Sequence, residues 1–238
     1  MEGVDGRGLV SVDELTFGSG DRTLAGSIVR PAAPSPAAPG LLFVHGLRST
    51  QNGYRDRAQA AATALGVTGL TFDLSGHGRS TGNLAELRPV DHLDDIVAAC
   101  DMLLGAGVDA ERVGVCAASY GAFLSCLLVA RRKVRRLLLR APGLYGDEVL
   151  GVALAQPLRS RTPAGRSEAL EALAQFDGEV MILESERDEL IDHSIIQAYL
   201  AARPDAHHEV LAGATHALSE PGWRQAFLDA IVKWFAAI

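Results

Sequence analysis

The chain has few cysteines, no excess of basic residues and no long apolar run. Each of these absences argues against one class of protein. Its three cysteines among 238 residues, Cys100, Cys116 and Cys126, stand in apolar surroundings at spacings that fit no metal site. An odd and sparse set of this kind indicates buried free thiols in a reducing compartment. We therefore predict a cytoplasmic protein that binds no metal ion.

The charge balance and hydropathy exclude two classes of partner. A formal net charge of −7 argues against a general nucleic-acid binder, because such a protein needs a basic face. No stretch approaches the roughly 18 consecutive apolar residues of a membrane-spanning helix. The Met1 to Leu9 segment is Gly-rich and acidic, without the apolar core of a signal peptide. We expect neither a nucleic-acid nor a membrane partner.

The composition that remains, 48% hydrophobic and 21% charged, is ordinary for a globular protein. Alternating residues in 9–17 and 23–29 predict a β-hairpin, and a proline-rich surface connection follows over 31–39. From residue 41 onward, strand-like and helix-like segments alternate. This order predicts an α/β fold with a mostly parallel sheet, an antiparallel N-terminal hairpin and helices on both faces. We expect one domain over residues 1–238.

One interval is too long for a simple crossover between parallel strands. The predicted strands cover 41–45, 67–73, 112–115, 134–139, 180–184 and 208–211, and the predicted helices cover 55–65, 90–104, 122–130, 167–176, 195–202 and 223–238. Asp91 is the expected N-cap of the second helix. The segment of about residues 144–166 belongs to none of these elements. We predict that it forms a cap insertion over the end of the sheet where ligands bind, and a long surface loop is the alternative.

The stretch from Val113 to Ala122 predicts a strand, a sharp turn and a helix, with Ser119 at the turn. A nucleophilic serine needs such an elbow, because its hydroxyl must be held where a base and oxyanion donors both reach it. The residues two before and two after Ser119 are Ala117 and Gly121, and both are small, as close packing of strand and helix requires. A helix N-cap serine is the alternative interpretation of this stretch alone.

A His-Gly turn ends the 41–45 strand at His45 and Gly46. Such a turn lets the backbone N–H of Leu47 approach a substrate carbonyl oxygen together with the N–H of Tyr120. We therefore predict Leu47 and Tyr120 as oxyanion-hole donors and His45 as a substrate-binding residue. A strand-ending glycine turn with a structural histidine is the alternative.

A carboxylate that orients an imidazole is expected after the 180–184 strand. Asp188 follows that strand by a few residues, with apolar residues behind it that suit a packed and directed loop. Glu184, Glu186 and Glu189 are its competitors. We predict Asp188 as the acid, and a surface acidic loop is the alternative.

His216 is the predicted base. It follows the last short strand and stands among small residues that allow its ring to be presented. The order along the chain is then nucleophile, acid and base: Ser119, Asp188 and His216. The other histidines precede the nucleophile or lie at helix or strand starts.

Five features occur together in one order: His45-Gly46, a D-x-x-G-H-G-x-S element from Asp73 to Ser80, Ala117-Ala118-Ser119-Tyr120-Gly121, Asp188 and His216. In this the chain resembles the α/β-hydrolase superfamily, and especially its small-capped esterases of the cinnamoyl/feruloyl esterase and serine-aminopeptidase-like group. The resemblance implies that Ser119 attacks an acyl carbonyl, that His216 moves the proton and that Asp188 holds the imidazole. It also implies oxyanion binding by the amides of Leu47 and Tyr120.

The sequence departs from this group in two places. Ala117 replaces the usual glycine, a tolerated change, and the cap is shorter than that of feruloyl esterases. Within the cap, Tyr145, Leu150 and Leu154 have a spacing compatible with an apolar face over the pocket, so we predict that they bind modest apolar or aromatic acyl groups. Packing of a small helix is the alternative.

The leading hypothesis is a cofactor-independent serine hydrolase that cleaves carboxylic esters of small to medium acyl groups through an acyl-enzyme intermediate. Its partner would be a small-molecule ester or thioester. An acyltransferase or thioesterase with the same triad is the first alternative, and a non-catalytic binding protein with this fold is the second. Monomer and homodimer are both compatible with the sequence.

Overall fold

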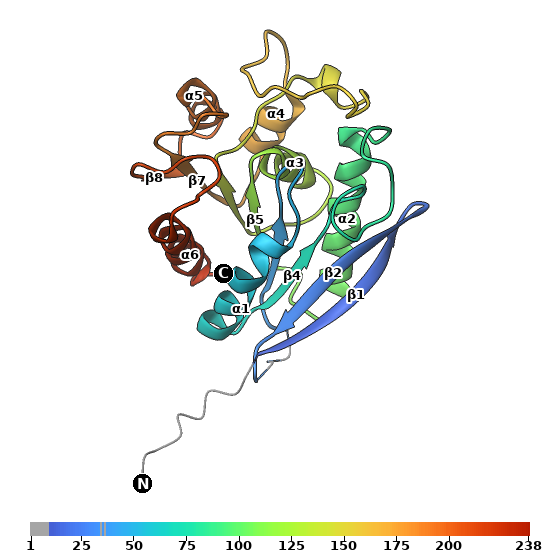
Figure 1. Cartoon of the computed structure of the whole chain (residues 1–238). Coiled ribbons are helices and arrows are strands. Elements are labelled where there is room, and N and C mark those ends of the chain that lie inside the picture. The colour runs from blue at the N-terminus through green and yellow to red at the C-terminus, as the bar shows by residue number, and fades with distance from the viewer. Residues whose placement is uncertain (1–9, 34, 36) are drawn as a thin grey trace.

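A computed structural model of the protein describes residues 10–33, 35 and 37–238; Leu9, at the predicted start of the hairpin, and positions 34 and 36 of the proline-rich connection lie outside this range. The predicted hairpin forms from β1 (Ser11–Ser19) and β2 (Arg22–Arg30), which pair antiparallel from Ser11↔Arg30 to Ser19↔Arg22. Gly20 makes the turn with a positive φ of 58°, a conformation that glycine adopts without steric penalty. The hairpin forms one edge of the molecule (Figure 1).

The hairpin continues into a single eight-stranded sheet with the order β1-β2-β4-β3-β5-β6-β7-β8. The remaining strands are β3 (Gly40–Val44), β4 (Thr68–Phe72), β5 (Val113–Ala118), β6 (Arg136–Arg140), β7 (Glu179–Ser185) and β8 (His207–Leu211). β2 pairs antiparallel with β4, and all pairs from β4 to β8 are parallel. The prediction of a mostly parallel sheet with an antiparallel N-terminal hairpin is confirmed.

Helices cover both faces of this sheet. α1 (Asn52–Leu65) and α6 (Pro221–Phe235) pack on one face, and α2 (Pro89–Gly105), α3 (Tyr120–Leu128), α4 (Glu168–Ala174) and α5 (His193–Ala202) pack on the other. The neighbouring positions of α1 and α6 are visible in Figure 1. None of the helices in the described part of the chain is long and apolar enough to span a membrane.

Several observed element boundaries differ from the predicted ones by a few residues, and two of these differences concern the site. Asp91 is the third residue of α2 rather than its N-cap, because Pro89 starts the helix earlier. Its carboxylate accepts the backbone N–H of Arg88, the actual N-cap, at 2.8 Å. The elbow strand extends beyond Val115 to Ala118, so only Ser119 separates β5 from α3.

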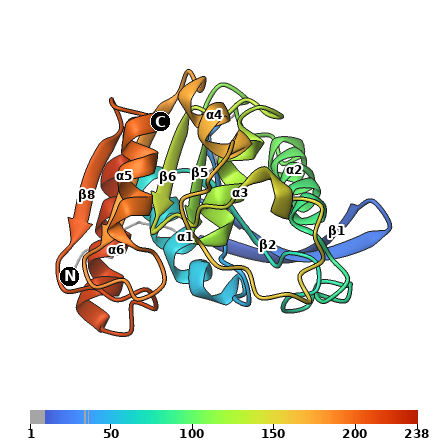
Figure 2. The same cartoon turned by 90° about the horizontal axis from the view of Figure 1, so that it is seen from above.

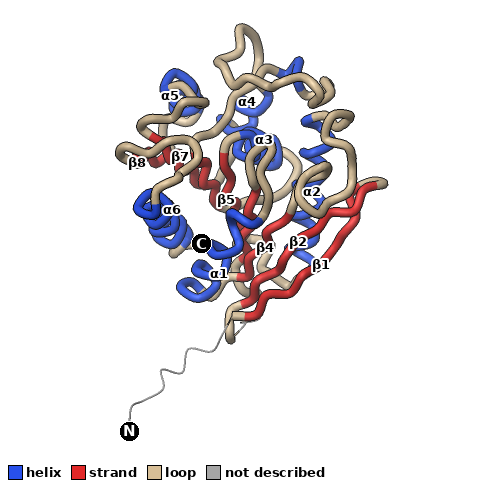
Figure 3. Tube along the Cα trace, viewed as in Figure 1, coloured by secondary structure: helices blue, strands red, loops and turns tan. Residues whose placement is uncertain are grey.

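The cap segment, residues 144–166, is irregular chain with one short 3₁₀ helix at Asp147–Val149. It runs across the top of the molecule (Figure 2), where the long loops gather above the sheet (Figure 3). The N–H of Leu154 donates to Leu87 O at 2.8 Å, which ties the segment to the loop before α2. This segment therefore contains no small α-helix of the kind considered from the sequence.

Candidate active site

Ser119 sits on a strained elbow at the carboxyl end of the central strand β5. Its φ of 55° and ψ of −122° are unusual for a residue with a side chain, and such strain is typical of functional positions. A Cβ added to Gly121 would lie 2.4 Å from the carbonyl oxygen of His45, so this position must be glycine. Ala117 is fully buried in the strand and accommodates its methyl group, so its departure from the usual glycine leaves the elbow intact.

Three predicted side chains form one hydrogen-bonded chain. His216 Nε2 lies 3.1 Å from Ser119 Oγ, and His216 Nδ1 lies 2.8 Å from Asp188 Oδ2 and 3.0 Å from Oδ1. An ionised carboxylate only accepts, so Nδ1 carries the proton and Nε2 is left as the acceptor for the serine hydroxyl. The arrangement has the polarity that general-base activation of Ser119 requires.

Asp188 is held as a carboxylate. Burial opposes its ionisation, since its side chain is only 3% exposed, but the hydrogen bonds that it accepts from His216 and from the backbone together outweigh burial. The backbone N–H groups of Leu190 and Ile191 each donate to Oδ1 at 2.9 Å. The pKa of Asp188 is therefore lowered, and the group stays ionised near neutral pH.

The competing carboxylates of this loop have other partners. Glu184 binds the rings of His193 and His208 at 2.7 and 2.9 Å. Glu186 accepts the N–H of Gly213 at 2.6 Å, and Glu189 accepts the backbone N–H of His216 at 3.1 Å. Two of these three carboxylates thus support the loop that carries His216, and only Asp188 reaches its ring.

The two predicted oxyanion donors face the same cavity as Ser119. Leu47 and Tyr120 both line it. Among the described residues, neither backbone N–H has a hydrogen-bond acceptor. A Cβ added to Gly46 would lie 3.2 Å from Ser119 Cβ, so the His-Gly turn lies directly against the serine. The free N–H groups are available to a substrate oxygen.

The loop that carries Leu47 is held in place by hydrogen bonds to the D-x-x-G-H-G-x-S element. His77 Nε2 accepts the N–H of Arg48 at 3.0 Å, and Asp73 Oδ1 accepts the N–H of Gln51 at 2.8 Å. Arg48 has a positive φ of 63°. Such a backbone persists only where the surroundings fix it, and His77 supplies that contact.

His45 does not line the cavity, and its predicted role in substrate binding is corrected. Its side chain is 1% exposed. Nδ1 donates to Gly46 O at 2.7 Å, and Nε2 accepts the N–H of Leu74 at 3.0 Å. Burial is the main reason that its pKa falls to about 4. His45 is therefore a neutral structural histidine that joins the two loops, the alternative considered from the sequence.

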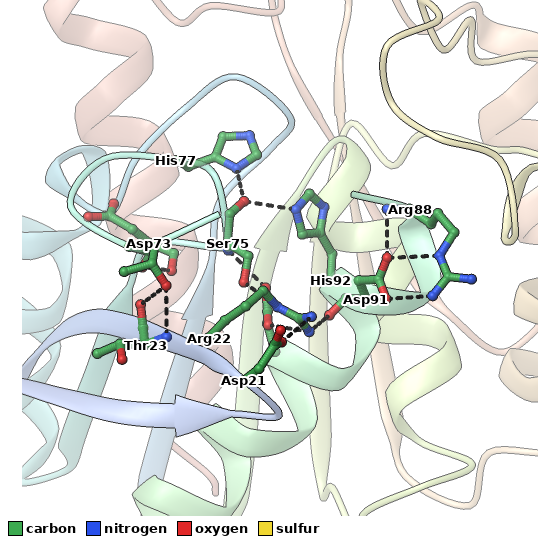
Figure 4. Close-up of polar contacts among 12 residues, drawn as sticks. Asp21, Arg22, Thr23, Asp73, Ser75, His77, Arg88, Asp91 and His92 are labelled. Carbon is green, nitrogen blue, oxygen red and sulfur yellow. Dashed lines mark hydrogen bonds and ion pairs between the residues drawn. The ribbon is translucent and has the colours of Figure 1, made fainter. Parts of the chain in front are cut away.

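A further histidine, His92, was not identified from the sequence. The rings of His77 and His92 both donate to the carbonyl oxygen of Ser75 at 2.9 Å, as Figure 4 shows. His92 Nδ1 accepts the hydroxyl of Tyr120 at 3.0 Å. Burial lowers the pKa of His92 to about 4, so it is neutral. No local motif marks this contact, because it joins α2 to α3 only in the folded chain.

A cavity of about 570 Å³ opens above Ser119 and His216. Tyr145 and Leu154 line it, as predicted, but Leu150 does not. Leu150 instead packs against the core beside α2, where its carbonyl accepts the N–H of Val90 at 3.1 Å. Its predicted contact with substrate is therefore corrected. Sequence spacing misplaced it because the segment is irregular rather than helical.

Two other chemistries have little support from the described residues. Cys116 is fully buried, and burial raises the pKa of its thiol to about 12, so it is not a competing nucleophile. No group of three or more His, Cys, Asp or Glu side chains in the described ranges is arranged to hold a metal ion.

With the fold and the geometry established, the chain is an α/β-hydrolase. Residues 36–167, more than half of the chain, match the family model described as serine aminopeptidase, S33. The chain belongs to this family of hydrolases. The matched region contains the elbow and the His-Gly turn but ends before Asp188 and His216. No curated protein sequence matches the chain.

Solved structures with this fold are numerous, and all those described here are distant in sequence. Est1E from Butyrivibrio proteoclasticus, with bound ferulic acid, has a TM-score of 0.74 at 16% identity over 92% of this chain and 96% of its own. A thioesterase domain from the curacin biosynthetic pathway has a TM-score of 0.69 at 16% identity over 94% and 99%. Mouse alpha/beta hydrolase domain-containing protein 10 has a TM-score of 0.70 at 20% identity, over 93% of this chain and 97% of its own. These likenesses show the fold.

Proposed function

We propose that the protein is a serine hydrolase that cleaves carboxylic esters of small to medium acyl groups. The observation that carries the proposal is the continuous chain from Ser119 Oγ through His216 to Asp188, set on a strained elbow at the floor of a cavity. The family, the Est1E fold and the resemblance to small-capped esterases support the same reaction class.

The proposed reaction follows from the tautomer of His216. Nε2 takes the Ser119 hydroxyl proton as Oγ attacks the acyl carbonyl, and the N–H groups of Leu47 and Tyr120 bind the resulting oxyanion. The imidazolium, stabilised by Asp188, returns the proton to the leaving alcohol as the C–O bond breaks. Water then repeats the sequence on the acyl-enzyme and releases the acid. No cofactor enters this scheme.

The cavity supports an apolar acyl group of modest size. Apolar and aromatic side chains form much of its lining, namely Leu47, Tyr145, Leu154, Leu158, Leu190 and Ile191. Burial of such an acyl chain is favourable in proportion to the apolar area that leaves water.

Turnover of p-nitrophenyl butyrate tests the proposal. Ser119→Ala should lower kcat by on the order of 10⁴-fold or more while the protein still folds. Ser194→Ala, at an exposed serine on α5, is the matched control and should retain full activity. Hydrolysis by Ser119→Ala at the wild-type rate would refute the proposal.

One observation favours thioester donors as a second candidate. Arg48 and Arg159 are exposed and line the same cavity, and neither has an ion-pair partner among the described residues. Two free cations beside an apolar pocket suit an acyl group attached to a phosphorylated carrier such as coenzyme A. Arg159→Ala should then raise KM for butyryl-coenzyme A but not for p-nitrophenyl butyrate. Arg161→Ala is the control, since it lines a different cavity.

A further inference from the structure

Arg140 carries a buried charge without a carboxylate partner. It is 7% exposed at the carboxyl end of β6, and among the described residues its side chain makes one hydrogen bond, from Nη1 to Ser185 Oγ at 3.3 Å. No carboxylate lies within ion-pair distance of it in the described part of the chain. The charge of Asp188 acts on Arg140 from beyond that distance, and Asp188 is itself bound to His216. A buried cation with no carboxylate in contact favours the binding of an anion.

Other partly buried arginines of the chain show the contrast. Arg22, Arg136 and Arg203 have side chains 17%, 12% and 12% exposed, and each is paired with a carboxylate. Arg136 is the most direct control for Arg140, because both side chains lie on the same face of β6. Its Nη2 binds Glu179 at 2.6 Å and its guanidinium stacks on an indole ring. Arg140 is more buried than any of these and is the one left unpaired.

Arg140 faces a cavity of about 270 Å³ on the α1 and α6 face, separate from the cavity above Ser119. Two more arginines, Arg57 and Arg224, line it, and its lining contains no carboxylate. The lining includes exposed Ser49 and Ser219, so the cavity opens to solvent.

The arginines are held in place rather than extended into water. The guanidinium of Arg57 lies 4.9 Å from the ring centre of Phe227, and that of Arg140 lies 5.9 Å from the same ring. Arg224 donates to the carbonyl oxygens of Leu218 and Ser219. Like charges fixed around one space repel each other and create a positive potential that an oxyanion relieves.

We propose that this cavity is a binding site for a small oxyanion, a phosphate or a carboxylate group of a ligand, with Arg140 as its central contact and Arg57 and Arg224 at its sides. The site adjoins the loop that carries His216, because residues 217–219 line it while His216 lines the other cavity. A ligand held there contacts residues 217–219, which follow the base directly in the chain.

The test measures thermal unfolding of the full chain at constant ionic strength, with inorganic phosphate or acetate replacing chloride. The wild type should show a saturable rise of about 5 °C in Tm with phosphate, with acetate or with both. A rise with phosphate alone assigns a phosphorylated ligand, and a rise with acetate alone assigns a carboxylated one. A rise with neither anion overturns the proposal.

Variants locate the site. Arg140→Met should lose the anion response, because the central cation of the site is removed while a side chain of similar length remains. Arg136→Met is the matched control and should keep the anion response. Equal responses in wild type and Arg140→Met would overturn the proposal.

A second variant and a hydrogen-exchange experiment test the location of the anion site independently. If Arg140→Met does not fold, Arg57→Gln replaces it, since Arg57 is only partly buried and should also lose the response. Hydrogen exchange should slow at residues 53–57 and 217–219 when the anion binds, and protection elsewhere alone would contradict the assignment. The response should persist in Ser119→Ala, so it is independent of the proposed hydrolysis.

Discussion

The loop that carries Leu47 and the cap segment both border Ser119, but they are fixed in different ways. The Leu47 loop is clamped by buried polar groups, including His45, His77 and Asp73, whose partners are backbone N–H groups. The cap segment is irregular and is tied mainly through its own backbone, as at Leu154. The proposed reacting groups are therefore strictly positioned, whereas the segment proposed to select the acyl group has fewer fixed contacts and should tolerate more change.

Of the groups that border Ser119, the ring of His216 has the most tightly fixed orientation, because Asp188 binds its Nδ1. Asp188→Asn should lower kcat for p-nitrophenyl butyrate by on the order of 10⁴-fold, because an amide no longer fixes the tautomer with Nε2 as acceptor. KM should change little. Glu186→Gln, on the same loop, is the control and should retain most of the activity. A loss below tenfold in Asp188→Asn would contradict its proposed role.

The elbow offers a comparison of two small residues. Gly121→Ala should lower the free energy of unfolding by about 3 kcal/mol and abolish most activity, because the new Cβ would clash with His45 O. Ala117→Gly should cost less than about 1 kcal/mol, the ordinary penalty of glycine in a strand. Urea unfolding of both variants measures the difference. Equal effects would contradict the account of the elbow.

The clamp of the Leu47 loop should be sensitive to acid. His45 has a folded pKa of about 4 against an ordinary value of 6.5, so the unfolded chain binds its proton first. The contribution of neutral His45 to the free energy of unfolding, up to roughly 3 kcal/mol, is fully present above pH 6.5. This contribution is lost as the pH falls through 4. His45→Gln should reduce the dependence of unfolding free energy on pH in this window, and part of the dependence that remains comes from His92, whose pKa is also about 4.

The smallest effect is expected in the cap. Leu154→Ala should shift the preference among p-nitrophenyl esters toward longer acyl chains by several-fold, because the cavity becomes larger. Leu150→Ala is the matched control from the same segment, since Leu150 lies off the cavity. A profile that changes equally in both variants, or in neither, would remove Leu154 from the acyl pocket.

Local patterns in the sequence predicted most of the fold and the hydrogen-bonded chain. Each strand and helix of the alternating region was identified, and Ser119, Asp188 and His216 were placed correctly enough to meet in space. These features are local: a strand end, a turn of small residues, a loop of fixed length.

The remaining features depend on contacts between distant segments. Whether His45 points into the pocket or into the protein is decided by the Leu74 N–H on another loop. The bond from His92 to Tyr120 joins α2 to α3. The sequence places Arg140 near the end of a strand, and only the packed structure shows that it forms no ion pair in the described part of the chain.

Labelling with a fluorophosphonate probe, followed by peptide mass spectrometry, tests the central claim most directly. The account predicts one covalent adduct, on Ser119, that is absent in Ser119→Ala and forms far more slowly in Asp188→Asn. An unlabelled wild-type protein would favour the non-catalytic alternative. An adduct on another residue that persists in Ser119→Ala would contradict the assignment of the nucleophile.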